Sequence, residues 1–553
     1  MERPVAERSA LYCPALALLL LASLSAFLGP NDYPVFSFEV GLLVLWGVLA
    51  GAFLALLAHH AGRGVAAIVL GGVLAFCIDL LFGLKGHKPL IVIVPIASVA
   101  LAWLLRRQVA TIVLAASAML FVSTLLLPVS GSRGVAAIEP MAHTAPAAAR
   151  DAPPVLLHLI LDEHIGIDGI PRDIGTDNDF AEWLTTFYSA RGFRLYADAY
   201  SEYFNTQISI SKLLNFDSDG DAGAHLIGDG EPYVLKDSAY FRDLARRGYR
   251  LHVYESDYMD FCRVPGIPYV SCTIYSGHKI GAIHRAPLAK LQRAEFILNS
   301  LLSRSYYLHK ARQGYQNARQ RWPGLNLPAW GAGTSRVGPL PVLPVLRRLE
   351  ADLRHARRGD AYFAHLLIPH YPYVLDAACT LRGDIDDWLY SGPAVPASQY
   401  ALNTPQSRAS RYSNYFAQIR CQQQLIERLF EALKAAGMWR DAIVVIHGDH
   451  GSRIVQHLPV PANAARLTAT DLRDAFSTLF ALRAPGIAPG VVNGNRPIQS
   501  LLGRAIGIEV PPIAPRVYLR SDGGALVTHR LPRSWLARSA DGEPVRAVPV
   551  ARH

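Results

Sequence analysis

The chain has 553 residues, with 54 Lys and Arg against 44 Asp and Glu, which gives a formal net charge of +10. Its length allows two or more domains. The basic surplus fits anionic partners such as phospholipid headgroups. The sequence contains neither a concentrated basic stripe nor a known nucleic-acid module, so we expect no nucleic-acid partner.

Apolar stretches follow one another through the first 129 residues, at 11–29, 35–58, 64–84, 89–105 and 108–128. Each has the roughly 17–25 residues that a helix needs to cross the hydrocarbon of a bilayer. The first could instead be a signal peptide, but four similar stretches come directly after it, so we expect it to be retained. Residues 1–129 are therefore predicted to form a transmembrane domain of five α-helices.

The loop charges predict the orientation of this domain. With the N-terminus inside, the cytoplasmic ends carry Arg3, Arg8, Arg63, Arg106 and Arg107, and the outer side carries Lys85, Lys88 and Arg133. This bias follows the rule that basic residues concentrate on the cytoplasmic side. We therefore expect a multi-pass protein of the bacterial inner membrane, with the residues after 130 in the periplasm.

One carboxylate, Asp79, lies inside the third apolar stretch. Charged groups within a membrane are costly, so Asp79 could mark a functional polar site. We favour the alternative, a carboxyl at a helix interface near the edge of the membrane.

The cysteines divide between the two parts of the chain. Cys13 and Cys77 lie in apolar stretches, and the other four lie in the outer part, where an oxidising compartment favours disulfides. Four cysteines allow three pairings, of which we favour Cys262–Cys272 and Cys379–Cys421. The sequence has no C-x-x-C metal pair.

The outer part begins after a linker, residues 130–153, that is rich in Ala, Pro and Ser. Apolar strands then alternate with helical segments. We expect strands within 155–166, 193–200, 250–256, 361–373 and 441–451, and helices within 179–192, 238–249 and 413–438. This alternation predicts an α/β domain over 154–515, with a mainly parallel sheet and helices on both faces. Ligands of such sheets gather beyond the carboxyl ends of the strands.

Two segments depart from the alternation. Residues 282–330 are helical, basic and aromatic, and we expect a helical insertion that is either a solvated hairpin or an element lying against anionic headgroups. Residues 516–553 form a C-terminal tail without a motif.

Polar side chains follow the first and last of the core strands. Asp162 and Glu163 come directly after an apolar run, and such adjacent carboxylates either cap a turn or bind a divalent cation that offsets their charge. Asp449 and His450 end the stretch "VVIHGDHGSR" and offer an oxygen and an imidazole nitrogen, a mixture that suits zinc or manganese. Arg453 lies two residues further on and could bind a phosphate or sulfate oxygen.

Two further segments could supply a nucleophile and an acid. In "YFNTQISIS", Asn205 and Thr206 precede a helix start, where a hydroxyl is either an N-cap or a nucleophile favoured by the helix N-terminus. In "HLLIPHYPY", His370 lies between two prolines and could donate a proton, whereas His365, in mid-strand, is expected to be a hydrogen-bonded core residue. The glycines 448 and 451 would let the backbone approach an ion.

Along the chain, the order is adjacent carboxylates, then Thr206, then His370, then Asp449 with His450. Segments in this order resemble the alkaline phosphatase/sulfatase superfamily. Five apolar stretches before such a domain make the chain most similar to lipid A phosphoethanolamine transferases and lipoteichoic acid synthases. The resemblance implies that Asp449, His450, Asp162 and Glu163 bind the metal, zinc or alternatively manganese. It also implies that Thr206 is the metal-bound nucleophile.

The resemblance further implies that His370 contacts the substrate phosphate and donates a proton, with Asn205 and Arg453 beside the substrate. It predicts transfer of a phosphoethanolamine or phosphoglycerol headgroup from a phospholipid donor, through a phospho-Thr intermediate, to an envelope glycan or lipid. A sulfatase-like phosphodiesterase and a non-catalytic lipid-binding regulator remain as alternatives.

Two departures from the family pattern bear on the substrate. The C/S-x-P-x-R sequence that sulfatases use to make formylglycine is absent, which argues against sulfate-ester hydrolysis. The transferases have Glu after their Asp-His-Gly, where this chain has Ser452 and Arg453, and His457 is a possible match to their further downstream His.

Overall fold

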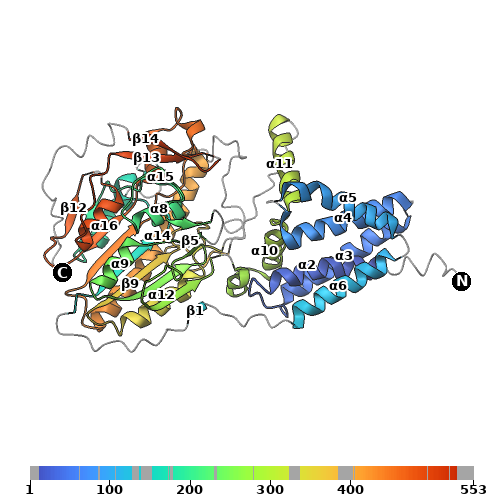
Figure 1. Ribbon diagram of the computed structural model, residues 1–553, viewed down its shortest axis with the longest axis horizontal. Helices are drawn as coiled ribbons and strands as arrows, with labels where there is room; N and C mark the ends of the chain where they lie inside the picture. Colours follow the sequence, from blue (N-terminus) through green and yellow to red (C-terminus); the bar gives the residue numbers. More distant parts are fainter. Residues whose placement is uncertain are drawn as a thin grey trace. The chain divides into compact units, whose positions relative to one another are not determined.

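The computed structural model groups the chain into two compact units (Figure 1). The first comprises Met1–Arg133, His278–Val337 and Gly383–Gly392, and the second comprises Gly134–Gly277, Gly338–Arg382 and Pro393–His553. The structure describes residues 12–60, 63–84, 87–105, 108–126, 136–138, 152–171, 174, 179–228, 233–277, 279–322, 337–383, 403, 405–494, 496–521 and 523–531. The predicted linker falls largely outside the described residues.

The first unit contains five apolar helices at the predicted places: α2 (Tyr12–Leu28), α3 (Phe38–His60), α4 (Arg63–Phe82), α5 (Lys88–Leu104) and α6 (Val109–Leu126). Two of them, α3 and α4, contain apolar segments of 21 and 19 residues, which are long enough to cross a membrane. The apolar segments of the other three are shorter. The five helices are confirmed as helices, and their passage through a membrane stays a prediction.

The segment 282–330, predicted as an insertion of the outer domain, is grouped with the apolar helices instead of the sheet. It forms α10 (Lys290–Leu302) and α11 (Tyr306–Arg321) after a 3₁₀ turn, η3 (Ile280–Arg285). Asp79 is buried and its Oδ2 accepts hydrogen bonds from Ser305 Oγ at 2.7 Å and Tyr307 N at 3.2 Å. Asp79 is therefore a helix-interface carboxyl that holds the start of α11.

The second unit is built on a nine-stranded mixed sheet with the order β1-β8-β6-β9-β2-β10-β11-β3-β12. The strands are β1 (Ala136–Ile138), β8 (Tyr269–Tyr275), β6 (Arg250–Ser256), β9 (Asp360–Leu366), β2 (Leu156–Leu161), β10 (Ile443–Gly448), β11 (Phe480–Arg483), β3 (Arg194–Tyr196) and β12 (Gly490–Val492). From β8 to β10 every pairing is parallel, while β11 and β1 pair antiparallel. The predicted parallel core is present within a mixed sheet.

Helices cover both faces of this sheet. On one face, Val253 and Phe363 pack into an apolar cluster with side chains of α8 (Thr206–Leu213), α9 (Ala239–Arg246) and α16 (Ile498–Ile506). On the other, Tyr254 Oη donates to Asp352 of α12 (Val342–Leu353) at 2.5 Å. This helix packs against α14 (Pro405–Ala435), whose Phe416 stacks on Phe180 of α7 (Phe180–Ser189).

Smaller elements complete the second unit. They are η2 (Ile167–Gly169), a small sheet of β4 (Leu226–Ile227), β5 (Tyr233–Leu235) and β7 (Met259–Asp260), η5 (Pro461–Asn463) and α15 (Ala469–Phe476). The predicted tail begins with a hairpin, β13 (Arg516–Arg520) and β14 (Leu526–Arg530), in which Tyr518 stacks on Tyr203.

Both favoured disulfides are present in the second unit. Cys262 bonds to Cys272, and Cys379 bonds to Cys421. Because these are the four cysteines of the outer part, none of them remains free to serve as a nucleophile.

Candidate active site and metal centre

The carboxyl ends of three adjacent strands bring the predicted residues together. Leu161, the last residue of β2, lies opposite Gly448 of β10 on one side and Leu366 of β9 on the other. The residues that follow these strands therefore leave the sheet at the same edge. The register, and not the sequence separation, makes Asp162 and Asp449 neighbours.

Three buried carboxylates form the centre of the site. Asp449 Oδ1 accepts a hydrogen bond from the backbone N–H of Glu163 at 3.0 Å, which fixes the two segments against each other. Asp162, Glu163 and Asp449 are all at most 2% exposed. In each of them one oxygen is buried without a hydrogen-bond partner, namely Asp162 Oδ1, Glu163 Oε1 and Asp449 Oδ2. Buried anionic oxygens of this kind normally need a cation or donors.

Burial and neighbouring charges shift the pKa values of all three carboxyl groups. Burial raises the pKa of Glu163 to about 8 although Arg453 opposes the shift. Burial, helped by the charge of Asp162, raises the pKa of Asp449 to about 7. Burial also acts to raise the pKa of Asp162, but the nearby His370 and other histidines outweigh it and hold that pKa below its usual range. A divalent cation would favour the ionised form of all three groups.

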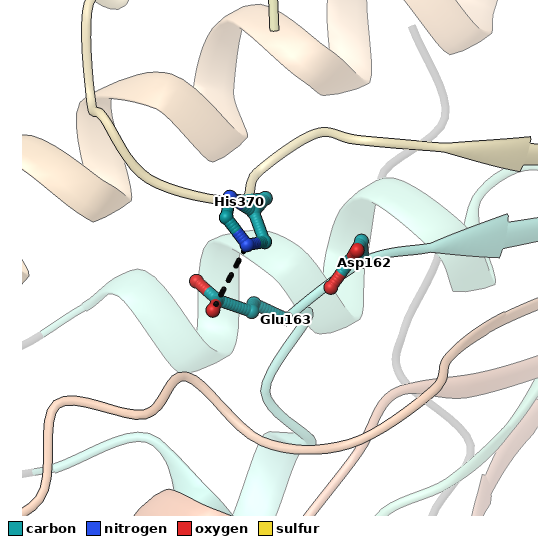
Figure 2. A group of neighbouring side chains, drawn as sticks. All are labelled: Asp162, Glu163 and His370. Atoms are coloured by element: carbon teal, nitrogen blue, oxygen red, sulfur yellow. Dashed lines mark ion pairs between the residues drawn. The ribbon is translucent and has the colours of Figure 1, made fainter. Parts of the chain in front are cut away.

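Two histidines from β9 and the loop after it reach the carboxylates. His370 Nε2 lies 3.4 Å from Glu163 Oε1, and Asp162 lies beside this pair (Figure 2). His365 Nε2 lies 3.5 Å from Asp162 Oδ2, while its Nδ1 lies 2.7 Å from Glu255 Oε1. His365 is a buried, hydrogen-bonded residue of the core, as expected, and its Nε2 also reaches the carboxylates of the site.

The hydroxyl of Thr206 lies beside the imidazole of His450. The distance from Thr206 Oγ1 to His450 Nε2 is 3.1 Å, and Thr206 is 4% exposed. Asn205 is the N-cap residue of α8, but its side chain makes no capping hydrogen bond. Thr206 is the first residue of the helix, so its hydroxyl is not used as an N-cap.

His450 is suited to bind a metal. Its Nε2 also lies 3.1 Å from Asp449 Oδ2, and its Nδ1 lies 2.9 Å from the carbonyl oxygen of Gly451. Burial and the charge of Arg453 both lower the pKa of His450 well below its ordinary value. The imidazole is therefore neutral, which is the form that coordinates metal ions.

Arg453 lies between Thr206 and the carboxylates. Its guanidinium NH2 lies 2.8 Å from His450 Nε2 and 3.5 Å from Thr206 Oγ1, and its NH1 lies 3.5 Å from Glu163 Oε1. The NH2 group also donates to the carbonyl oxygen of Phe204 at 3.0 Å. A cationic fork in this position can bind the oxygens of a group attached to Thr206.

A buried hydrogen-bond network stabilises the loop that carries His450 and Arg453. The side chain of Asp474 accepts two hydrogen bonds from Arg408, at 2.9 and 3.0 Å, and one from Tyr412 Oη at 2.5 Å. Tyr412 Oη also lies 2.7 Å from Ser452 Oγ. A Cβ on Gly451 would lie 2.2 Å from the carbonyl oxygen of Asp474, so this glycine is required by the approach of protein backbone and not by an ion.

One residue proposed from the sequence lies away from the carboxylates, and one residue that the sequence did not single out lies beside His365. His457 is bonded to Asp471, with Nδ1 2.9 Å from Oδ2, and among the described contacts it has none with the carboxylate cluster. Glu255, on β6, was not singled out by the sequence, because only the register of β6 against β9 places it beside His365.

The donor set fits a divalent cation of the zinc or manganese type. Two overlapping groups have one ligand atom per residue within 4.8 Å of one another: Asp162, Glu163 and His370, and Asp162, His365 and Asp449. All five residues are buried. A mixture of carboxylate oxygen and imidazole nitrogen is typical of such sites.

Comparisons with known proteins give one family match. Residues 363–477 match the sulfatase family model. No curated protein sequence matches the chain.

Three solved structures are similar to the chain at low identity. The C-terminal periplasmic domain of EcEptC from Escherichia coli, in complex with Zn, is 11% identical over 68% of this chain and 92% of that chain, with a TM-score of 0.38. The phosphonate monoester hydrolase of Agrobacterium radiobacter is 12% identical over 68% and 82%, with a TM-score of 0.38. The C-terminal periplasmic domain of the phosphoethanolamine transferase EptC from Campylobacter jejuni is 10% identical over 64% and 89%, with a TM-score of 0.34.

The segment that matches the family model contributes the late half of the site. It begins within β9 and includes the loop with His370 and the β10 turn that carries Asp449 and His450. This part of the chain is similar to the sulfatase family.

Proposed function

We propose that the chain is a membrane-bound, metal-dependent transferase. It would move a phosphoethanolamine or phosphoglycerol headgroup from a phospholipid donor to a glycan or lipid of the cell envelope. The observation that carries the proposal is the position of the Thr206 hydroxyl, 3.1 Å from His450 and 3.5 Å from Arg453, beside three buried carboxylates. A hydroxyl there can be both activated and, once modified, held by a cation.

The metal would be held by Asp162, Glu163, Asp449 and His450. The unpartnered buried oxygens of the three acids support this assignment. When bound, the ion lowers the pKa of a neighbouring hydroxyl and offsets the charge on phosphoryl oxygens. Zinc agrees best with the mixed oxygen and nitrogen donors.

Thr206 would act as the nucleophile of the first half-reaction. Its proton passes to water, its Oγ1 forms a bond to phosphorus, and the bond from phosphorus to the glyceride oxygen breaks. Arg453 binds a phosphoryl oxygen as charge develops. His370 gives a proton to the departing glyceride oxygen, so that a neutral diacylglycerol leaves.

The second half-reaction reverses these roles. An acceptor hydroxyl gives its proton to His370 and attacks the phosphorus on Thr206. The bond to Thr206 Oγ1 breaks, and this oxygen regains a proton. The headgroup phosphate has then moved from the lipid to the acceptor without a net gain or loss of protons.

The lack of a free cysteine in the second unit supports a threonine nucleophile over a formylglycine made from cysteine. The cysteines of the second unit are all joined in disulfides, as Cys262–Cys272 and Cys379–Cys421. The apolar helices of the first unit support a location in a bilayer, where donor lipid would reach the site by lateral diffusion.

Turnover of a labelled phospholipid by the full chain in vesicles tests the proposal. We expect Thr206→Ala to lower the rate of diacylglycerol release by at least about 10³-fold, because the nucleophile is removed. The matched control is Thr185→Ala, which removes a helical threonine whose hydroxyl donates to Ala181 O at 2.7 Å. Full turnover by Thr206→Ala would contradict the proposal, and release of free headgroup phosphate in the presence of acceptor would favour the hydrolase alternative.

A further inference from the structure

His365 differs from the other buried histidines of the sheet. His158 has both ring nitrogens engaged, Nδ1 with Tyr240 Oη and Nε2 with His447 Nε2, each at 2.8 Å. His447 in turn has its Nδ1 2.7 Å from the carbonyl oxygen of Gly448. These are satisfied core histidines. His365 is 0% exposed, yet its Nε2 has no hydrogen-bond partner.

The free nitrogen of His365 faces the carboxylates. Its Nε2 lies 3.5 Å from Asp162 Oδ2, and one ligand atom each of His365, Asp162 and Asp449 lie within 4.8 Å of one another. Asp162 Oδ1 and Asp449 Oδ2 also lack hydrogen-bond partners. Three buried residues, each with a ring nitrogen or carboxylate oxygen that has no hydrogen-bond partner, therefore bring ligand atoms together on the scale of one coordination sphere.

Glu255 fixes the ring of His365 in this orientation. Its Oε1 lies 2.7 Å from His365 Nδ1 and accepts further hydrogen bonds from Ser256 N at 2.7 Å and Ser256 Oγ at 3.0 Å. Tyr254 lies opposite Ala364 in the register, which places Glu255 across from His365. A carboxylate that accepts from Nδ1 leaves the lone pair on Nε2, an arrangement that metal-binding histidines commonly have.

We propose that His365 is an additional ligand of the metal centre and that Glu255 is its positioning residue. This inference rests on the proposed metal centre. It adds a second imidazole, beside His450, to the donors that the family motifs imply. It also gives Glu255 a role that lies outside every motif in the sequence.

Zinc binding to the full chain in detergent tests the inference, by competition with a chromophoric chelator. We expect His365→Ala and Glu255→Ala to weaken zinc binding by roughly 10–100-fold. Glu255→Gln should recover much of the loss, because its amide oxygen can still accept a hydrogen bond from Nδ1. If Glu255 had only a structural role, Glu255→Ala and Glu255→Gln would lower the zinc affinity equally.

A matched control removes another histidine that contacts carboxylates, at a place outside the candidate site. His225 lies 2.9 Å from both Asp217 and Asp237, and His225→Gln should leave zinc affinity unchanged. Wild-type zinc affinity in folded His365→Ala and Glu255→Ala proteins would overturn the inference but leave the proposed function standing. A wild-type chain that binds no zinc or manganese would remove the metal centre itself.

X-ray absorption of the zinc-loaded wild-type chain gives a test that needs no variant to fold. We expect the fine structure to require at least two imidazole ligands, His365 and His450. A fit with a single imidazole would overturn the inference. Where His365→Gln folds, its spectrum should lose the scattering of one imidazole relative to wild type.

Discussion

At the scale of single residues, two members of the site have unusual backbone conformations. Glu163 has φ of 65° and Arg453 has φ of 56°, in the left-handed region that side chains with a Cβ disfavour by roughly 1–2 kcal/mol. Both belong to the turns that end the core strands β2 and β10. Strain of this kind is tolerated where it aims a functional side chain.

This strain predicts a difference between glycine and alanine at the same position. In the metal-free chain, we expect Glu163→Gly and Arg453→Gly to be more stable than the matching Ala variants by about 1 kcal/mol, because glycine adopts positive φ freely. Thermal unfolding in detergent would measure the difference. Thr185, in α7, is the control, where Gly should be less stable than Ala by about 1 kcal/mol. Gly variants at 163 or 453 that are less stable than the Ala variants would refute the interpretation.

The residues that the sequence predicted were those at strand ends. Asp162, His370 and Asp449 follow apolar runs, and the rule that ligands gather at the carboxyl edge of a parallel sheet identified them. His365 and Glu255 lie inside strands, where a polar residue in a buried run is usually satisfied by the core. Only the register of β6 against β9 reveals their contact, and the sequence of neither strand specifies which residues will lie opposite each other.

At the scale of elements, the order of helices and strands followed from hydrophobic periodicity. The five apolar helices and the strands β2, β9 and β10 occur where they were expected. The antiparallel β11 was not foreseen as such, because strand direction depends on the path of the connecting chain. The sequence alone could not show which part of the chain the insertion 282–330 packs against. Its contacts with Asp79 join residues that are more than 220 positions apart.

The start of α15 predicts a pH dependence of stability. Burial acts to raise the pKa of Asp471, but hydrogen bonds from His457 and Thr468 outweigh it and lower this pKa below its ordinary value of 3.8. Ionised Asp471 therefore stabilises the fold above pH 3.8, and this contribution is lost as the pH falls through the lower pKa of the folded state.

We expect Asp471→Asn to be less stable than wild type by about 1 kcal/mol at pH 7, the usual value of a helix cap. The difference should shrink as the pH falls below 4. Thermal unfolding of both chains between pH 3 and pH 7 measures it. Asp441→Asn, at a site whose side chain is 64% exposed, is the control and should change the stability at pH 7 by less than about 0.5 kcal/mol. A difference for Asp471→Asn that stays constant with pH would contradict the assignment.

At the scale of the whole molecule, the proposed membrane helices and the candidate site belong to different units. The first unit holds the apolar helices together with α10 and α11, and the second holds the sheet, both disulfides and the candidate site. The disulfides agree with the predicted oxidising compartment. Composition and hydropathy predicted a change near residue 130, but they did not predict the grouping of residues 278–337 with the first unit.

The predicted topology can be tested with reporter fusions. A reporter that is active only outside the cytoplasm should be active when fused after residue 531 and inactive when fused after Arg107, because the charge bias retains that loop inside. Activity measured in intact cells and normalised to expression gives the orientation. An inactive C-terminal fusion would contradict five crossings.

Trapping of the covalent intermediate tests the central claim most directly. The full chain is incubated with zinc and phospholipid donor without acceptor, and then analysed by intact mass and peptide mapping. We predict a mass increase equal to one headgroup phosphate, located on Thr206, and its loss when an acceptor glycan or lipid is added. The adduct should be absent from Thr206→Ala and present in Thr185→Ala. A donor that is turned over with no adduct on Thr206, or with an adduct on another residue, would contradict the account.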